Sequence, residues 1–169
     1  MGALNAAREL GPAIGLIVFL IDAAKGAGSV WIAENLGVGQ VWIFFAGSAA
    51  VIGHCWPVFL KFKGGKGIAT SAGVLVAWVA VPLLLVLAVW IIVFLLSRYV
   101  SLASITAAAA LPFTVWAFAG SPTMTLVTAG LGGLAIYKHK SNIKRLLSGT
   151  ESRIVLKKGP SADAAKPTA

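Results

Sequence analysis

Apolar side chains fill six long stretches of the chain, and short polar or glycine-rich segments separate them. The first two stretches are about 20 residues long, enough at about 1.5 Å per residue to cross a hydrocarbon core of about 30 Å. Tryptophan lies near several of their ends, as is typical of helices anchored at a membrane interface. The pattern predicts an all-α, polytopic helical membrane bundle with about six membrane helices, over residues 11–33, 40–60, 68–81, 83–97, 101–119 and 122–137.

The apolar run from 68 to 97 is too long for one span, because a helix of that length would measure about 45 Å. Pro82 lies at its middle, and a proline inside a helix removes a hydrogen bond and tends to break the helix. Gly120, Ser121 and Pro122 interrupt the next apolar run in the same way. We therefore expect two helical hairpins, one turning at Pro82 and the other at the Gly-Ser-Pro segment.

The placement of basic residues agrees with the hairpins. Lys61, Lys63 and Lys66 follow the second stretch, Arg98 follows the fourth, and eight more Lys or Arg lie in 138–169. With both hairpins formed, 13 of the 14 basic residues lie on one side of the membrane, which the positive-inside rule makes the cytoplasmic side. A single pass through the long apolar run would instead divide them between the two sides.

The composition excludes a soluble domain. Of the 169 residues, 59% are hydrophobic and 11% are charged, whereas soluble domains average about 45–50% and about 25%. The net charge of +9 is first a topology signal in such a chain, and we expect no nucleic-acid partner. A single cysteine, Cys55, excludes an internal disulfide and a cysteine-based metal cluster, and we expect no metal site. The length suits one membrane domain over 1–148, and the polar tail over 149–169 is expected to be disordered.

A glycine- and lysine-rich segment between the second and third stretches is a candidate anion site. Gly64, Gly65, Lys66 and Gly67 directly precede a predicted helix. Glycine lets backbone N–H groups approach an oxyanion, the helix N-terminus adds positive potential, and lysine supplies charge. The segment does not match the Walker A pattern. From spacing alone, a basic loop whose lysines only face lipid headgroups is an equal alternative.

Two further polar clusters lie at predicted span ends on the basic side. Ser101 and Ser104 are three residues apart and share a helix face. Serines in membrane helices most often bond their own backbone or a neighbouring helix, so spacing alone favours a structural role. His139 and Asn142 have the same spacing after the last stretch, where an ordinary basic membrane boundary is the simpler interpretation.

Two ionisable residues, Asp22 and Lys25, fall inside the first stretch. Ionisable groups in the bilayer are costly, so they normally face the bundle interior and pair. Their spacing permits an ion pair, and we expect a structural or site-supporting role. For His54, near the end of the second stretch, we expect its side chain to satisfy backbone carbonyls.

Three segments together carry a family resemblance. GHCWPVFLKFKGGKGIAT, RYVSLASI and YKHKSNIKRLLSGTE occur in this order with apolar spans between them, and they resemble the bacterial acyl-phosphate:glycerol-3-phosphate acyltransferases. The resemblance covers most of residues 2–154. It implies a helical bundle, usually of seven spans, in the bacterial inner membrane, with its site and C-terminus on the cytoplasmic side. It also implies an acyl phosphate donor made by a soluble acyltransferase, glycerol 3-phosphate as acceptor, and no cofactor.

The resemblance also implies roles for individual residues. Lys66, Ser101 and His139 would be catalytic. The proton acceptor would be either His139 or the phosphate of the acceptor substrate, because both have suitable pKa values. The glycine loop would hold the donor's phosphate, and transfer would be direct, because no Ser-His-Asp arrangement is legible. The residues expected to bind substrate are Asn5, Arg8, Gly64, Gly65, Gly67, Ser104 and Asn142.

The chain departs from the family pattern at its start. Met1 to Arg8 match only the end of the family's Ser-Gly-Asn-x-Gly-Ala-Thr-Asn-x-x-Arg segment, with Leu4 in the place of the threonine. The chain is thus N-terminally shortened relative to that pattern, and we expect Met1 to Leu10 to be poorly ordered without a preceding helix. Two alternatives to the enzyme stay open: a small membrane anion transporter and a truncated, non-catalytic paralogue.

Overall fold

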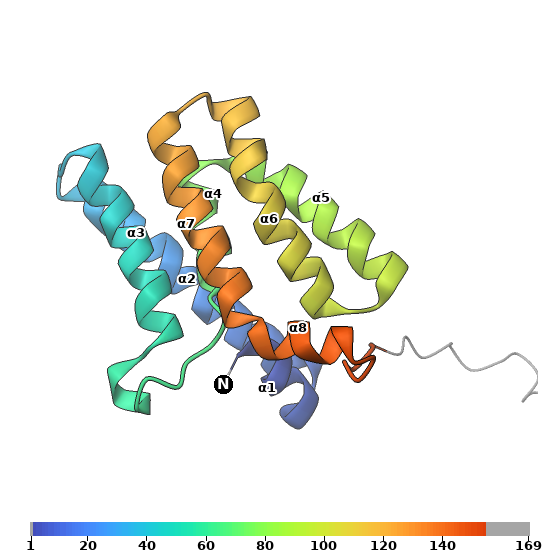
Figure 1. Cartoon of the computed structure of the whole chain (residues 1–169). Coiled ribbons are helices and arrows are strands. Elements are labelled where there is room, and N and C mark those ends of the chain that lie inside the picture. Colours follow the sequence, from blue (N-terminus) through green and yellow to red (C-terminus); the bar gives the residue numbers. More distant parts are fainter. Residues whose placement is uncertain (1, 155–169) are drawn as a thin grey trace, which may run out of the picture.

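The computed structural model describes residues 2–154, and this part of the chain is helical throughout, with short connections (Figure 1). Its helices begin and end close to the predicted apolar stretches. The elements are α1 (Ala3–Leu10), α2 (Pro12–Asn35), α3 (Gln40–Cys55), the short 3-10 helix η1 (Val58–Leu60), α4 (Ile68–Trp78), α5 (Ala80–Ser97), α6 (Val100–Ala119), α7 (Pro122–Lys138) and α8 (Lys140–Leu147).

The predicted membrane bundle is confirmed. Four segments are long and apolar enough to cross a membrane, and the remaining two predicted stretches form the shorter helices α4, of 11 residues, and α7, of 17 residues. Helix α3 ends at Cys55 rather than at residue 60, because Pro57 lacks an N–H and disfavours helical geometry in the residue before it. The four long segments are Pro12–Asn35, Gln40–Leu60, Ala80–Ser97 and Val100–Ala119.

The break in the long apolar run lies at Val79, not at Pro82 as the sequence suggested. Val79 has φ −149° and ψ 65° and separates α4 from α5. Pro82 is the third residue of α5 and is buried. Proline is tolerated in the first turn, because the N–H groups there have no partner within the helix. The proline therefore stabilises the start of the second helix, while the turn precedes it.

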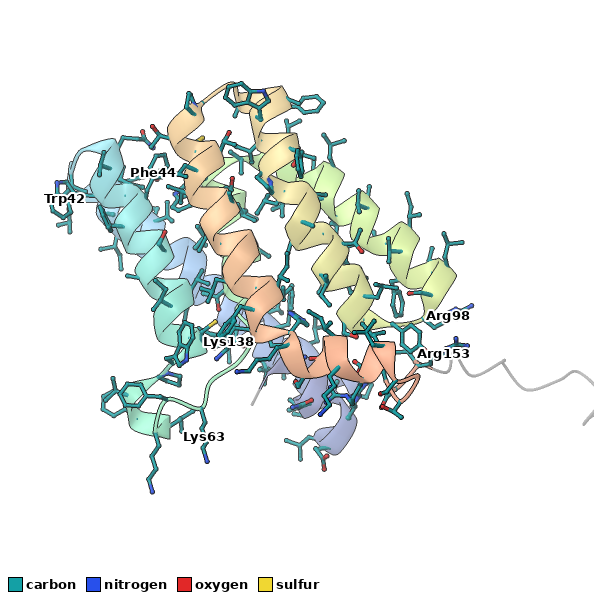
Figure 2. All side chains as sticks on the ribbon, in the orientation of Figure 1. Trp42, Phe44, Lys63, Arg98, Lys138 and Arg153 are labelled. Carbon is teal, nitrogen blue, oxygen red and sulfur yellow. The ribbon has the colours of Figure 1, made fainter. Side chains whose placement is uncertain are left out.

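The helices form a bundle whose two ends differ (Figure 1). The α2–α3, α4–α5 and α6–α7 turns lie at one end. Helices α1 and α8, η1 and the glycine-rich loop lie at the other end, and Lys63, Arg98, Lys138 and Arg153 lie at this same end (Figure 2). These four basic residues agree with the one-sided distribution expected from the two hairpins, whereas Lys157, Lys158 and Lys166 lie outside the described residues. We call this end the basic end.

Glycines let α2 and α4 approach closely in the bundle interior. A Cβ added to Gly26 would overlap the carbonyl oxygen of Thr70, and one added to Gly73 would overlap that of Ala23. Small residues at a helix contact allow backbones to approach, and this is a common way for membrane helices to associate.

The N-terminal residues do not follow the expectation of poor order. Residues 3–10 form α1, which packs on α2: a Cβ added to Gly15 would overlap Ala7. Ala6 is buried. This contact fixes α1 against the basic end of the bundle, so Arg8 has a defined place.

Candidate active site

The glycine loop follows η1 and leads into α4 at the basic end. The N–H of Gly65 donates to the carbonyl oxygen of His54 at 3.2 Å. A Cβ on Gly64 would overlap that carbonyl, and a Cβ on Gly65 would overlap the His54 ring. Gly67 caps α4 with φ +79°, a conformation that favours glycine. The loop therefore needs glycine in order to lie against the last turn of α3, and it leads to a helix N-terminus suited to an anion.

Glu151 connects α6 and α8 at the same end. Its Oε1 accepts hydrogen bonds from Ser101 Oγ and Asn142 Nδ2, each at 2.7 Å, and its Oε2 accepts one from Arg145 Nε at 2.7 Å. Its side chain is only 7% exposed. Burial raises the pKa of the Glu151 carboxyl, but these three hydrogen bonds outweigh burial and the pKa lies below its ordinary value. We call Glu151, Ser101, Asn142 and Arg145 the Glu151 cluster.

The first residues of the segment expected as a polar tail lie against the bundle. Residues 149–154 contact the bundle: besides Glu151, the N–H of Ile154 donates to the carbonyl oxygen of Arg98 at 3.0 Å. Contacts with the helices thus extend beyond residue 148, to Ile154. The rest of the expected tail, 155–169, lies outside the described residues.

Lys66 lies within electrostatic reach of the Glu151 cluster. Burial lowers the pKa of the Lys66 ammonium, Glu151 opposes this change, and the nearby Arg145 and Arg8 reinforce it. The side chain is partly buried. A lysine held among other cations and largely out of water gains from the arrival of an anion, because the anion restores favourable charge balance.

His139 is 3% exposed and lies at the junction of α7 and α8. Its Nδ1 lies 2.7 Å from the carbonyl oxygen of Ala135, so Nδ1 carries the proton and Nε2 is the acceptor. Burial lowers the pKa of the imidazole and the charge of Lys66 adds to the effect, while the Ala135 hydrogen bond and Glu151 oppose it. A neutral imidazole is the form that can accept a proton at neutral pH.

The remaining sequence-predicted residues have different positions. Arg8 is exposed on α1 within electrostatic reach of Lys66. Asn5 is exposed on the same helix, and within residues 2–154 it makes no hydrogen bond to the Glu151 cluster. Ser104 is buried between helices, where its hydroxyl accepts a hydrogen bond from Trp90 Nε1 at 3.1 Å. The structure therefore does not bring Ser104 to the cluster, and packing of α5 on α6 accounts for its polar side chain.

A basic pocket of 260 Å³ opens beside Lys66. Lys138 forms one wall: its Nζ donates to the carbonyl oxygen of Cys55 at 2.7 Å and lies 4.4 Å from the centre of the Trp56 ring. Sequence reasoning missed Lys138 and Trp56, because nothing in the sequence distinguishes them from an ordinary basic membrane boundary. The pocket is lined by Trp56, Gly64, Gly65, Lys66, Tyr137, Lys138, Lys140 and Ser141.

An apolar groove of 400 Å³ runs between α3 and α7. Trp56 lines both the groove and the basic pocket, so the two share a wall. The groove is lined by Ser48, Ile52, Trp56, Leu126, Val127, Gly130, Leu131 and Leu134.

Among residues 2–154, no group of three or more His, Cys, Asp or Glu comes together to hold a metal ion. The described part of the chain instead combines a glycine loop, a half-buried lysine, a buried histidine and an apolar groove. This combination defines an integral membrane protein whose basic pocket adjoins an apolar groove.

Comparison with known proteins identifies the family. The family model for glycerol-3-phosphate acyltransferase matches residues 1–149, and the chain belongs to this family. It is therefore a transferase of the acyltransferase class, which decides against the anion transporter left open by the sequence. A glycerol-3-phosphate acyltransferase of Geotalea daltonii is 41% identical over 152 residues, covering 90% of this chain and 78% of the relative. One of Desulforudis audaxviator is 47% identical over 161 residues, covering 94% and 79%.

Solved structures agree with the fold. The lysophosphatidic acid form of PlsY, an integral membrane glycerol 3-phosphate acyltransferase, superposes with a TM-score of 0.84 at 41% identity, covering 91% of this chain and 79% of that one. The glycerol 3-phosphate form of PlsY gives a TM-score of 0.85 at 39% identity, covering 91% and 78%. The chain is thus a multi-pass membrane protein of the same architecture.

Proposed function

We propose that this chain transfers a fatty acyl group from acyl phosphate to the sn-1 hydroxyl of glycerol 3-phosphate, giving 1-acylglycerol 3-phosphate and inorganic phosphate. The reaction takes place at the basic end, on the cytoplasmic face of a bacterial inner membrane. The observation that carries the proposal is the position of Lys66, which lines the basic pocket and also lies within electrostatic reach of the Glu151 cluster. Two phosphorylated substrates can meet on its two sides.

The acceptor, glycerol 3-phosphate, is assigned to the side of the Glu151 cluster. Asn142 Oδ1 is buried and has no hydrogen-bond partner within the described residues. It can therefore accept a hydrogen bond from a hydroxyl group of the glycerol. Arg8 and Lys66 supply positive charge for its phosphate, arginine in a forked geometry and lysine as a point charge. Asn5, exposed on α1 near Arg8, reaches the same ligand. Ser101 donates its hydroxyl proton to Glu151, so its Oγ can accept a hydrogen bond from a hydroxyl group of the glycerol.

The donor is assigned to the basic pocket and the apolar groove. Its phosphate lies against Gly64, Gly65 and Gly67, where the N-terminus of α4 and the charge of Lys66 favour an anion. The acyl chain passes Trp56 and continues along the groove between α3 and α7. Because Trp56 lines both spaces, one ligand can place its charged end in the pocket and its tail in the groove.

The reaction is a direct acyl transfer. The sn-1 oxygen forms a bond to the acyl carbonyl carbon, and the bond from that carbon to the phosphate oxygen breaks. The phosphate leaves with the electron pair. The proton of the hydroxyl goes to Nε2 of His139 or to the phosphate of the acceptor, and both have suitable pKa values. Ser101 donates to Glu151 and forms no Ser-His pair, so we favour a path without an acyl-enzyme.

Acyl phosphates are reactive mixed anhydrides of fatty acids, and a separate enzyme must make them. A soluble acyltransferase that converts acyl-carrier-protein thioesters into acyl phosphates supplies the donor to this chain. The basic end, which carries Lys63, Lys138 and Lys140, is the surface where an anionic donor arrives from that enzyme.

The test is acyl transfer by the purified protein in nanodiscs. Palmitoyl phosphate and glycerol 3-phosphate should give inorganic phosphate and lysophosphatidic acid in equal amounts, and acyl-coenzyme A should not replace the donor. Lys66→Ala should lose at least about 100-fold in kcat/KM, the scale expected for a preorganised charge at a reacting phosphate. The exposed Lys63 of the same segment is the matched control, and Lys63→Ala should stay within about threefold. Equal loss in both variants, or no turnover of palmitoyl phosphate by the wild type, would refute the proposal.

A further inference from the structure

Asp22 and His54 lie next to the glycine loop, and neither has a part in the chemistry described above. We infer that they form a positioning pair: Asp22 on α2 orients His54 at the end of α3, and His54 sets the shape of the glycine loop for phosphate binding. The inference rests on the proposed function and adds two residues to the site that do not touch substrate.

His54 contacts the loop through both its backbone and its ring. Its carbonyl oxygen accepts the hydrogen bond from Gly65 N–H at 3.2 Å. Its ring packs so closely on Gly65 that an added Cβ would overlap Nε2. Because Gly65 is followed directly by Lys66, a movement of the His54 ring shifts the lysine and the loop N–H groups together.

Asp22 holds the other edge of the ring. His54 Nδ1 lies 3.4 Å from Asp22 Oδ1, and the side chains are 11% and 8% exposed. The same oxygen forms an ion pair with Lys25, which confirms the pairing expected from their spacing. With Nδ1 facing Asp22 and Nε2 facing Gly65, the imidazole is fixed between helix α2 and the loop.

The position of Asp22 inside the membrane-spanning helix α2 requires an explanation. A buried carboxylate in a membrane-spanning helix is costly unless it is paired, and an apolar residue at position 22 would avoid the cost. The expectation that His54 satisfies backbone carbonyls through its side chain is not met, because the ring faces Asp22 and Gly65 instead. A carboxylate is useful here because it orients the imidazole that the loop packs against.

Other residues of α3 also contact the loop or are held near it. Lys138 holds the Cys55 carbonyl oxygen at 2.7 Å, and an added Cβ on Gly67 would press on Val51 and on the Sγ of Cys55. The last turn of α3 thus provides the contacts that define the path of the loop. Asp22 belongs to α2 and acts on the loop only through the His54 ring.

The test measures phosphate affinity and turnover separately in nanodiscs. Asp22→Asn and His54→Phe should raise KM for the phosphorylated substrates and the inhibition constant of inorganic phosphate by about 10- to 100-fold, the scale for loss of one hydrogen bond to a charged group. The value of kcat should fall by less than about threefold. Ser29 on α2 bonds only the Gly26 carbonyl of its own helix, so Ser29→Ala is the matched control and should leave both constants unchanged.

A double-mutant cycle separates positioning from general damage. Gly65→Ala should weaken phosphate inhibition strongly in the wild type, because its methyl group meets the His54 ring. In a His54→Ala background the ring is absent, and the same substitution should cost at least about tenfold less. If His54→Phe does not reach the membrane, this cycle and Asp22→Asn carry the test.

Two results would overturn the inference alone: wild-type phosphate inhibition in Asp22→Asn and His54→Phe, or independent effects in the cycle. In both cases the wild type would still transfer the acyl group and Lys66→Ala would still fail, so the proposed function would stand. An inactive wild type would overturn the proposed function and this inference with it.

Discussion

Ser101 on α6 and Asn142 on α8 donate hydrogen bonds to the same carboxylate oxygen of Glu151, each at 2.7 Å. The two helices are thereby joined at the basic end through a residue that lies beyond both of them in the chain. This shared acceptor fixes the relative position of two side chains that we propose to act on the same substrate.

Replacing Glu151 should damage both stability and activity in a pH-dependent way. We expect Glu151→Gln to lower the free energy of unfolding by about 2 kcal/mol, as for hydrogen bonds to a charged group, and to reduce kcat/KM at least about tenfold. Because the folded-state pKa of Glu151 lies below its ordinary value, the stability it contributes is fully present above the ordinary value and is lost as pH falls through the folded pKa.

Thermal unfolding of the wild type and Glu151→Gln between pH 7 and pH 3 checks this prediction. The difference in Tm should be constant at neutral pH and should shrink below about pH 4.3, the ordinary value for a glutamate. A difference that grows on acidification would show that the carboxylate destabilises the folded chain.

His139→Gln should lower kcat by at least about 100-fold, as expected for loss of a general base, with a smaller change in KM. The wild-type rate should fall on the acid side, through a pKa below the ordinary histidine value because burial lowers it. Measurement of kcat against pH for both proteins decides the proton acceptor. If the variant keeps the acid limb of the profile, the phosphate of the acceptor takes the proton instead.

Replacing Ser101 and replacing Ser104 should have different effects on activity, although the two serines share a helix face. Ser101→Ala removes a donor to Glu151, and we expect a loss of about tenfold or more in kcat/KM. Ser104→Ala should keep wild-type kinetics and lose about 1 kcal/mol of stability, because Trp90 Nε1 loses its acceptor. Steady-state kinetics and thermal unfolding of the two variants give the comparison, and reduced turnover in Ser104→Ala would return this serine to the site.

Filling the apolar groove should affect long donors selectively. A Cβ on Gly130 or on Gly133 meets nothing within 4 Å, but only Gly130 lines the groove. Gly130→Leu should raise KM for palmitoyl phosphate about tenfold, roughly the loss of one or two buried methylene contacts, and should leave butyryl phosphate unaffected. Gly133→Leu is the matched control. Equal behaviour of the two variants would place the acyl chain elsewhere.

The membrane orientation is testable with single cysteines at the two ends of the bundle. Lys63 and Gln40 are both exposed, at the basic end and at the α2–α3 end respectively, while the native Cys55 is buried. A membrane-impermeant maleimide should label Lys63→Cys only in inverted vesicles and Gln40→Cys only from the periplasmic side. The reverse pattern would place the site outside the cytoplasm.

Hydrophobic patterning predicted the helices well, because a lipid-facing helix must be apolar over its whole length and a polar segment must end it. The turn at Val79 was predicted at Pro82, because a proline is the visible helix breaker in the sequence. A proline is tolerated in the first turn of a helix, however, and the sequence does not show where the helix begins. The family motifs pointed to Lys66, His139 and Asn142, and their roles stay predictions. Glu151 was missed because a polar tail shows no sign of folding back.

The position of a residue on a helix face also did not predict how far its side chain lies from the end of the bundle. Ser101 and Ser104 have the spacing of neighbours, but one turn of helix separates a side chain at the bundle end from one between helices. Lys138 likewise reads as an ordinary basic boundary residue, and only the path of α3 brings the Cys55 carbonyl to its ammonium. Such contacts depend on tertiary structure, so local sequence cannot show them.

The apolar groove between α3 and α7 has an open side, since Ile52 and Leu126 on its walls are exposed. A groove that is open along one side can hold an acyl chain without selecting its length. The fatty-acid composition at the sn-1 position of new phospholipids would then follow the pool of activated acids that the cell offers. A bacterium adjusting its membrane fluidity at this step would do so by changing that pool, with the acyltransferase left as it is.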